Sequence, residues 1–133
     1  MASPSGLLLV EGVTPDNYAC LEDHITALPI ATTKNINTAS AVVIASLRDK
    51  ISISAAEEIV RDRPENGYSS MEDFLNHPGL AAAELTADGL SLASDFFMTR
   101  GQAIFAEAEI SLYSLVASRD GKVKIWGRSI GTY

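Results

Sequence analysis

TKNINTASAVVIASLRDKISISAAEEIVRDRPENGYSSMEDFLNH, residues 33–77, is the stretch that decides the fold, because it predicts three consecutive short helices. Thr38 stands before residues 39–48, whose apolar side chains return at the three- and four-residue spacing of one buried helical face. Pro64 and the Asn66-Gly67 pair separate the second predicted helix from the third. Helices of two or three turns are unstable alone in water, so the three must pack on one another.

The second and third of these helices each begin with a capping-box pattern. Ser54 is followed three residues later by Glu57, and Ser69 is followed at the same spacing by Glu72. In such a box the hydroxyl accepts from a backbone N–H in the first turn while the carboxylate reaches back. The pattern therefore predicts N-caps at Ser54 and Ser69, in addition to the one at Thr38.

The composition describes a globular protein of one domain or two small ones. The chain has 133 residues, of which 47% are hydrophobic, which is enough for a packed core. Its formal net charge is −7, from 17 acidic and 10 basic residues, and such a field repels polyanions such as nucleic acid. One cysteine, Cys20, excludes an internal disulfide and a cysteine cluster for zinc.

The flanking segments extend the helical part and then change its character. Thr14-Pro15-Asp16 favours a helix start, which predicts a helix over residues 15–25 and thus about four helices up to Asn76. Residues 80–85 form one or two further turns. From Leu90 onward the hydrophobic period changes from that of a helix to two.

Three antiparallel strands are predicted in the last part of the chain. They cover residues 96–105, 110–117 and 123–130, and the Asp-Gly pair at 120–121 supplies the tight hairpin turn between the last two. The sequence thus predicts an α+β chain, with a helical module over residues 1–89 and a three-stranded meander over 90–133. Such a meander needs a cover, so an edge or a face is expected to serve a partner.

The search for reaction chemistry finds no enzyme signature. His24 and His77 are isolated from other metal-type residues, and the Glu57-Glu58 and Glu72-Asp73 pairs suit the first turns of helices. The last pair, Glu107 and Glu109, suits the solvent face of a strand. We therefore expect no catalytic residues, no metal ligands and no enzymatic activity.

Two families share the central motif. INTAS at residues 36–40 and ENGYSSMEDFL at 65–75 resemble the helix-hairpin-helix DNA-binding module of the competence type, whose connecting turn is glycine-rich so that its backbone reaches a phosphate. Here that turn, residues 48–53, has no glycine and contains an acid. The helix-hairpin-helix DNA-binding protein stays the alternative, with an uncharacterised enzyme as a more distant one.

The second resemblance covers residues 7–133, nearly the whole chain. LLLVEGVTPDNYACL, INTASAVVIASL, ISAAEEIV and YSSMEDFL follow in the order seen in the family of type II secretion system protein K, and LSLASDFFMT and SLYSLVASRDGKVKIWGRSIGTY resemble its closing strands. This resemblance implies a sterile-alpha-motif-like helical module followed by the last strands of a pilin-type sheet. It also implies that the chain is a C-terminal part, with earlier strands and an N-terminal helix lying outside it.

The same resemblance implies a function in assembly. A minor pseudopilin of this family caps the tip of the periplasmic pseudopilus and starts the fibre with minor pseudopilins I and J, for protein export across the outer membrane. It is anchored in the inner membrane through an N-terminal helix that this chain does not contain, and nucleic acid is not a partner. Some relatives bind calcium, but the sequence assigns no ligands, so no cofactor is predicted.

Aromatic and aliphatic strand residues are the candidates for partner or sheet contact, because such side chains supply interface energy. The bland alternative is that they form an ordinary intramolecular core. The candidates are Phe96, Phe97, Ile110, Leu112, Tyr113 and Trp126.

Overall fold

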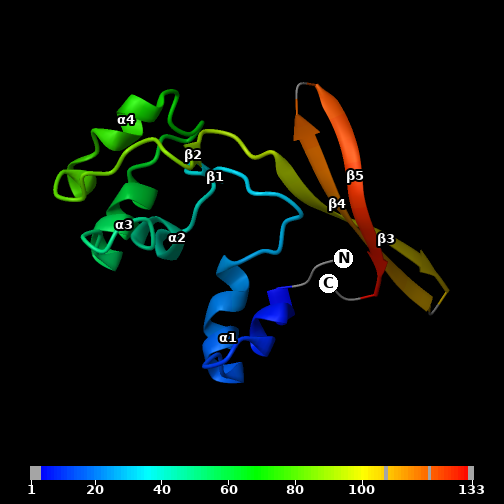
Figure 1. The fold of residues 1–133 in the computed structure, drawn as a ribbon. Coiled ribbons are helices and arrows are strands. Elements are labelled where there is room, and N and C mark those ends of the chain that lie inside the picture. The colour runs from blue at the N-terminus through cyan, green and yellow to red at the C-terminus, as the bar shows by residue number, and fades with distance from the viewer. Residues whose placement is uncertain (1–3, 107, 120, 132–133) are drawn as a thin grey trace. The chain divides into compact units, whose positions relative to one another are not determined.

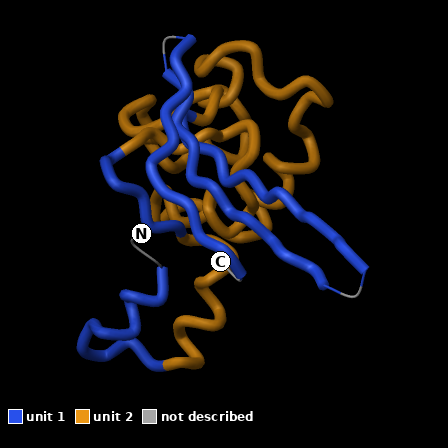
Figure 2. The backbone as a smooth tube through the Cα atoms, turned by 90° about the vertical axis from the view of Figure 1, so that its right-hand side faces the viewer, with its two compact units in different colours: residues 1–14, 26–31, 95–133 blue, residues 15–25, 32–94 orange. Residues whose placement is uncertain are grey.

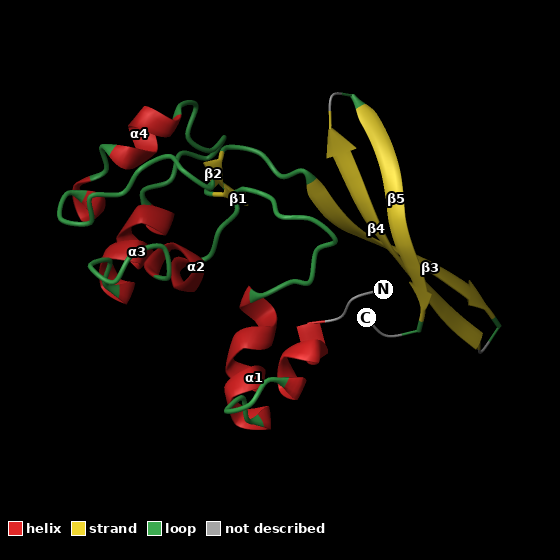
Figure 3. Cartoon of the chain, in the orientation of Figure 1, coloured by secondary structure: helices red, strands yellow, loops and turns green. Residues whose placement is uncertain are grey.

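The structure is a computed structural model that describes residues 4–106, 108–119 and 121–131. It contains both helices and sheets, so the predicted α+β class is confirmed (Figures 1 and 3). The chain divides into two compact units: residues 1–14, 26–31 and 95–133 form one, and residues 15–25 and 32–94 form the other (Figure 2). We call these the strand unit and the helical unit. The predicted domains, 1–89 and 90–133, stay a prediction.

The helical elements are short. They are the 3-10 helices η1 (Pro4–Leu9), η2 (Glu22–His24) and η3 (Pro78–Leu80) and the α-helices α1 (Pro15–Leu21), α2 (Ala41–Ala45), α3 (Ile53–Arg61) and α4 (Met71–Leu75). The helix predicted over 15–25 begins at Pro15 as expected, but its α-helical part ends at Leu21. The chain tightens into η2 and becomes extended at Ile25, where ψ is 154°.

The predicted N-cap at Thr38 is wrong, and Ser40 takes that place. The N–H groups of Thr38 and Ala39 both donate to the carbonyl of Asn35, so a turn occupies residues 35–39 and the helix cannot yet begin. Ser40 has an extended backbone, and its hydroxyl accepts from Val43 N at 3.4 Å. The helix therefore begins two residues later than the predicted cap at Thr38 indicated.

The two capping boxes are also displaced. Ser52, not Ser54, caps α3 by accepting from Ala55 N at 3.2 Å, because Ile51 is buried and the backbone enters the helix directly after it. Ser70, not Ser69, caps α4 by accepting from Asp73 N at 3.1 Å. In both cases the sequence offers two candidate serines, and the structure uses the one that directly precedes the first helical residue.

One apolar cluster holds the helical unit together. Its four largest fully buried side chains come from the loop before α2 and from each of the three α-helices that follow, and they are Ile36, Ile44, Ile59 and Phe74. The Tyr68 ring meets Phe74 edge-on, with centroids 5.5 Å apart. Helices α2, α3 and α4 thus bury their apolar sides against one another, as their instability in isolation requires, whereas α1 contributes no buried residue.

A short parallel ladder closes this unit and was not predicted. Strand β1 (Lys34–Asn35) pairs in parallel with β2 (Leu90–Ser91), and Leu90 belongs to the buried cluster. Two residues per strand give no period that a sequence can reveal. Its consequence is that Leu90 and Ser91 complete the helical unit, although the period of two predicted from Leu90 onward suggested that they open the meander.

The predicted antiparallel meander is confirmed. Strands β3 (Phe96–Phe105), β4 (Ala108–Arg119) and β5 (Lys122–Ile130) form a sheet in the order β3-β4-β5. A bulge between Leu115 and Val116 of β4 gives β5 one extra residue. Gly121 has the positive φ, 69°, that the predicted hairpin turn needs, while Asp120 of that turn lies outside the described residues.

Candidate interaction surface

The Asn37 side chain joins three parts of the helical unit. Its Nδ2 donates to the carbonyls of Tyr68 and Leu92, both at 3.1 Å, and its Oδ1 accepts from Tyr68 N at 2.8 Å. The INTAS segment is thereby tied to the turn before α4 and to the segment after β2. This motif, which both resemblances share, acts here as a scaffold.

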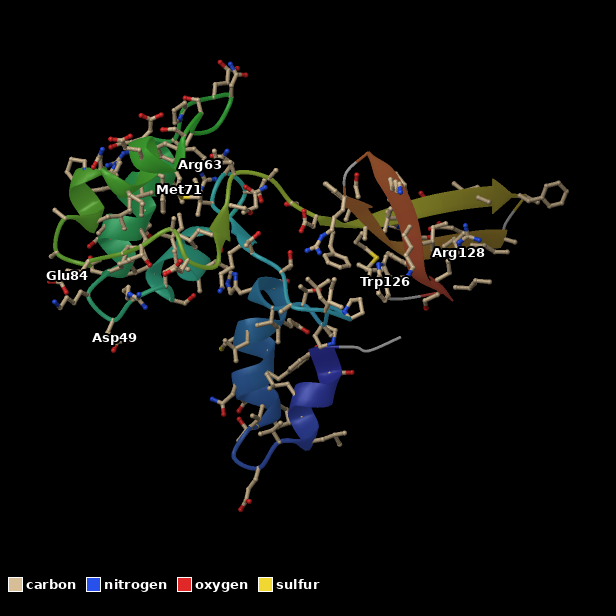
Figure 4. The ribbon with its side chains drawn as sticks, turned by 45° about the horizontal axis from the view of Figure 1, so that its top comes forward. Asp49, Arg63, Met71, Glu84, Trp126 and Arg128 are labelled. Carbon is tan, nitrogen blue, oxygen red and sulfur yellow. The ribbon has the colours of Figure 1, made fainter. Side chains whose placement is uncertain are left out.

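Arg63 adds to this junction from the end of α3 (Figure 4). Its guanidinium donates to the carbonyls of Asn37 at 2.9 Å and Ala39 at 2.7 Å, while its buried Nε has no hydrogen-bond partner among the described residues. Burial raises the pKa of the nearby Tyr68 hydroxyl above its ordinary value; the charge of Arg63 opposes this shift and that of Asp62 adds to it. The loop before α2 is thus held by side chains, not by a regular ladder.

The connection between α2 and α3 does not offer a bare backbone. Ile51 is buried, its N–H donates to the carbonyl of Arg48, and exposed Lys50 lies 4.0 Å from Glu84. A cavity of about 320 Å³ at this connection is lined by Arg48, Asp49, Lys50, Ala83 and Glu84. Two basic and two acidic side chains balance there, so the cavity gives no excess positive charge for a phosphate.

The six predicted contact residues lie on both faces of the β3-β4-β5 sheet. Residues paired across neighbouring strands share a face, and alternate residues of one strand do so too. Phe97 pairs with Val116, which shares its face with Ile110 and Leu112. Phe96 and Tyr113 lie on the opposite face, and the Phe96 ring lies 6.5 Å from that of Trp126. The structure thus separates the candidates into two groups of three.

The first group belongs to a broad apolar surface. Four of its members range from 38% to 56% in exposure, and we call them the apolar face: Phe97, Ile110, Leu112 and Ile125. Three residues on the same side of the sheet are more exposed: Phe105, Val123 and Ile130. A sheet face of this kind is well suited to packing against another apolar element. The role of these residues in partner contact stays a prediction.

The second group lies among charged side chains that the sequence analysis missed. Lys124 Nζ lies 4.2 Å from the centre of the Trp126 ring, and the Arg100 guanidinium lies 5.8 Å from that of Tyr113. Arg119 forms an ion pair of 2.6 Å with Asp95. The alternation of Lys122, Lys124 and Trp126 indicates that they share a face. A net charge of −7 for the whole chain does not reveal this local basic cluster.

The described part of the chain contains neither a candidate metal site nor a candidate membrane-spanning helix. Among those residues, no three His, Cys, Asp or Glu side chains come together in a way that could hold a metal ion, so no calcium ligands are assigned. Nor does any helix there have the length and apolar character needed to cross a membrane.

Comparisons with known proteins converge on one of the two resemblances. A family model described as "Type II secretion system (T2SS), protein K" matches residues 35–93. Type II secretion system protein K of Pseudomonas aeruginosa is 26% identical over 116 residues, and that of Pectobacterium carotovorum is 29% identical over 141 residues. These alignments cover 86% and 100% of this chain. Over most of its length this chain is therefore similar to type II secretion system protein K.

The segment that matches the family model coincides with a structural boundary. Residues 35–93 begin inside β1 and end just after β2, so they contain the Asn37 junction and all of α2, α3 and α4. The six candidate contact residues fall outside the family model but inside the two pairwise alignments taken together. The chain spans 34% and 43% of the lengths of these two relatives.

Proposed function

We propose that this chain is part of a minor pseudopilin that caps the tip of the periplasmic pseudopilus of a type II secretion system. It would start assembly of the fibre together with minor pseudopilins I and J, at the periplasmic face of the inner membrane. Similarity to type II secretion system protein K supports this role. The observation that carries the assembly role is the apolar face, which leaves aromatic and aliphatic side chains exposed on the sheet.

The proposed mechanism is packing and steric blocking, without an enzymatic step. Desolvation of aromatic and aliphatic side chains supplies most of the energy at protein interfaces, and the apolar face presents Phe97, Ile110 and Leu112 for that purpose. The helical unit would add bulk that prevents further subunits from joining beyond it. The apolar core of the helical unit is buried by residues of that unit. The unit therefore needs no further subunit to cover its core, which suits a blocking role.

DNA binding, the alternative from the sequence, gains nothing from the connection between α2 and α3. Binding to a phosphate backbone depends on cations that displace counterions and on a close approach of backbone N–H groups. In this connection Arg48 and Lys50 are matched by Asp49 and Glu84, and Ile51 points its side chain into the core.

Mixing the chain with purified minor pseudopilins I and J and measuring the mass of the complex tests the proposal. Ile110→Ser removes an apolar side chain from the apolar face and should weaken the complex by about tenfold, or 1.4 kcal/mol. Ile53→Ser is the matched control, because Ile53 is exposed to a similar degree, 50% against 56%, on α3 of the helical unit. We expect it to leave assembly unchanged.

Two results would overturn the proposal. One is the absence of any complex at concentrations of about 50 μM, well above the dissociation constants of stable assemblies. The other is tight binding of duplex DNA by fluorescence anisotropy with an affinity that falls steeply as salt rises, which is the signature of counterion release.

A further inference from the structure

A pocket in the strand unit is lined by both aromatic and cationic side chains. It has a volume of about 340 Å³ and is lined by Ile30, Phe96, Ala117, Arg119, Lys122, Lys124 and Trp126. Trp126 marks its place on β5 in Figure 4. We call it the cationic pocket. It lies on the face of the sheet opposite the apolar face.

The strand register brings the three cations of this pocket together. Arg119 pairs with Lys122 and Ala117 pairs with Lys124, so the basic side chains stand on one face within two residues of each other. Arg119 is already bound to Asp95, through Nη2 at 2.6 Å and Nε at 2.8 Å. Among the described residues, Lys122 and Lys124 form no ion pair with a carboxylate of this chain.

The distribution of charge along the chain makes this cluster unusual. Residues 95–133 contain five basic and four acidic residues, a net charge of +1, whereas residues 1–94 contain five basic and thirteen acidic residues, a net charge of −8. Two ammonium groups that form no ion pair within the described part of the chain therefore stand beside aromatic rings on an acidic molecule. An anion would be attracted to this pocket and repelled by most of the remaining surface.

The geometry points to a binding site for an acidic peptide segment of a partner protein, in which a Glu or Asp stands next to an apolar residue. The carboxylate would bind Lys122 and Lys124, and the neighbouring apolar side chain would lie on Phe96 and Trp126. Lys124 already lies over the Trp126 ring, so it is positioned before a ligand arrives. This inference goes beyond the proposed role in secretion and does not depend on it.

The shape of the pocket favours a peptide over a small free acid. Trp126 is 39% exposed and Phe96 is partly buried, so a flat apolar strip continues from the cations along the strands. A small carboxylic acid would bind the ammonium groups and leave the apolar side chains exposed to solvent. A peptide covers both, and charge complementarity gives it orientation as well as affinity.

The single tryptophan of the chain provides the measurement, because Trp126 itself lines the pocket. The probe is the synthetic peptide acetyl-Gly-Ser-Glu-Phe-Glu-Ser-Gly-amide, titrated into the full chain at low salt while tryptophan emission is recorded. Two control peptides replace both Glu by Gln or replace Phe by Gly. We expect a saturable change in emission with the first peptide and binding at least about tenfold weaker with either control.

Variants of the pocket locate the binding site. Lys122→Gln/Lys124→Gln should lower the affinity for the Glu-Phe peptide about tenfold and flatten its salt dependence. Arg128→Gln is the matched control, because Arg128 is on the same strand but pairs with Ser114 on the apolar face. It should bind the peptide like the parent chain. Circular dichroism of each variant verifies that these exposed substitutions leave the fold intact.

Four results would overturn the inference. Equal affinity for the Glu and Gln peptides would show that charge does not contribute to binding. A loss of affinity in Arg128→Gln as large as that in Lys122→Gln/Lys124→Gln would show that the pocket is not the binding site. Equally tight binding of 3-phenylpropionate or of a single-stranded oligonucleotide would identify a different class of ligand. A concentration-dependent change in emission without peptide, matched by dimer formation in sedimentation, would assign the pocket to a second copy of this chain.

Discussion

At the scale of single residues, the helical unit depends on a close fit between Asn37 and Gly67. Gly67 has a φ of 78°, and a Cβ built on it would lie 2.7 Å from Cγ of Asn37. The Asn37 side chain needs that space, because it binds the N–H and the carbonyl of Tyr68 and the carbonyl of Leu92. Glycine is therefore required here by crowding as well as by backbone conformation.

Gly67→Ala should destabilise the helical unit by about 3 kcal/mol, because it adds a clash and disturbs the Asn37 hydrogen bonds. Gly89→Ala is the matched control: Gly89 also has a positive φ, 74°, but no atom lies within 4 Å of its would-be Cβ. That variant should lose only about 1 kcal/mol. Urea unfolding followed by far-UV circular dichroism measures both, and equal losses would contradict the crowding argument.

Tyr68 makes the stability of the helical unit fall at high pH. Burial raises the pKa of its hydroxyl in the folded state above the ordinary value of 10.0. The stabilisation is fully present below that ordinary value and is lost as the pH rises through the raised pKa, since only the unfolded chain releases the proton easily. Tyr68→Phe should flatten this alkaline decline in denaturant unfolding, and an unchanged decline would assign it to another group.

At the scale of elements, helix starts are settled by packing between neighbours. Two serines lie at the start of α3 and two lie at the start of α4, and in each pair one residue caps the helix and the other does not. Beside the Ser70 cap, Ser69 Oγ donates to Asp73 Oδ2 at 3.2 Å on the exposed side of α4. The two serines therefore contribute to stability by different amounts.

Ser70→Ala should cost about 1 kcal/mol, the usual loss for an N-cap whose backbone N–H is left without its partner. Ser69→Ala removes only an exposed hydroxyl contact to a carboxylate and should cost about 0.5 kcal/mol or less. Thermal or urea unfolding of both variants distinguishes the observed cap from the one predicted by sequence. The reverse order would contradict the structure.

Much of this element structure could be predicted from the sequence. The hydrophobic period of two and the Asp-Gly turn gave the three strands, since both signals are local. The caps were misplaced by one or two residues because Thr38, Ser54 and Ser69 are chemically as suitable as their neighbours. The β1-β2 ladder could not be predicted, because it joins Lys34 to Leu90 across the whole helical unit.

The candidate surface was predictable only in part, because a sequence alternates without showing which side is covered. Leu112 and Leu115 are both leucines of β4, yet Leu115 is 4% exposed and Leu112 is 38% exposed. Alternation along β5 places Trp126 on one face with Lys124, but it cannot show which residues of the neighbouring strands lie there. Only the register identifies its neighbour Phe96 on β3.

Leu115→Ala should destabilise the strand unit by about 3 kcal/mol, because it leaves a cavity at a buried position. Leu112→Ala should cost about 1 kcal/mol or less, since much of that side chain is already in contact with solvent. Unfolding followed by Trp126 fluorescence reports on this unit directly. Equal losses at the two positions would show that the apolar face is covered in solution.

At the scale of the whole molecule, charge is divided unequally along the sequence. The helical unit, residues 15–25 and 32–94, has five basic and twelve acidic residues, a net charge of −7. This charge produces repulsion within the helical unit that the strand unit, with five residues of each sign, does not share. Raising NaCl from about 20 to about 200 mM should therefore stabilise the helical unit by about 0.5 kcal/mol, because the Debye length falls to below about 10 Å.

Urea unfolding at the two salt concentrations, followed by far-UV circular dichroism, measures this effect. Glu57→Gln/Glu65→Gln removes two charges from the helical unit and should reduce the gain from salt. Arg128→Gln changes a charge of the strand unit and should leave that gain as it is. A salt response of the same size in the parent chain and in Glu57→Gln/Glu65→Gln would contradict the repulsion argument.

The junction at Asn37 also governs how fast the helical unit reaches its native state. Its partners at Tyr68 and Leu92 lie 31 and 55 positions away along the polypeptide. The entropy of closing such long loops must be lost before the hydrogen bonds form, so the barrier is set by distant contacts. This unit should refold more slowly than an all-helical bundle of equal size, and its transition state must already hold the two ends of the segment together.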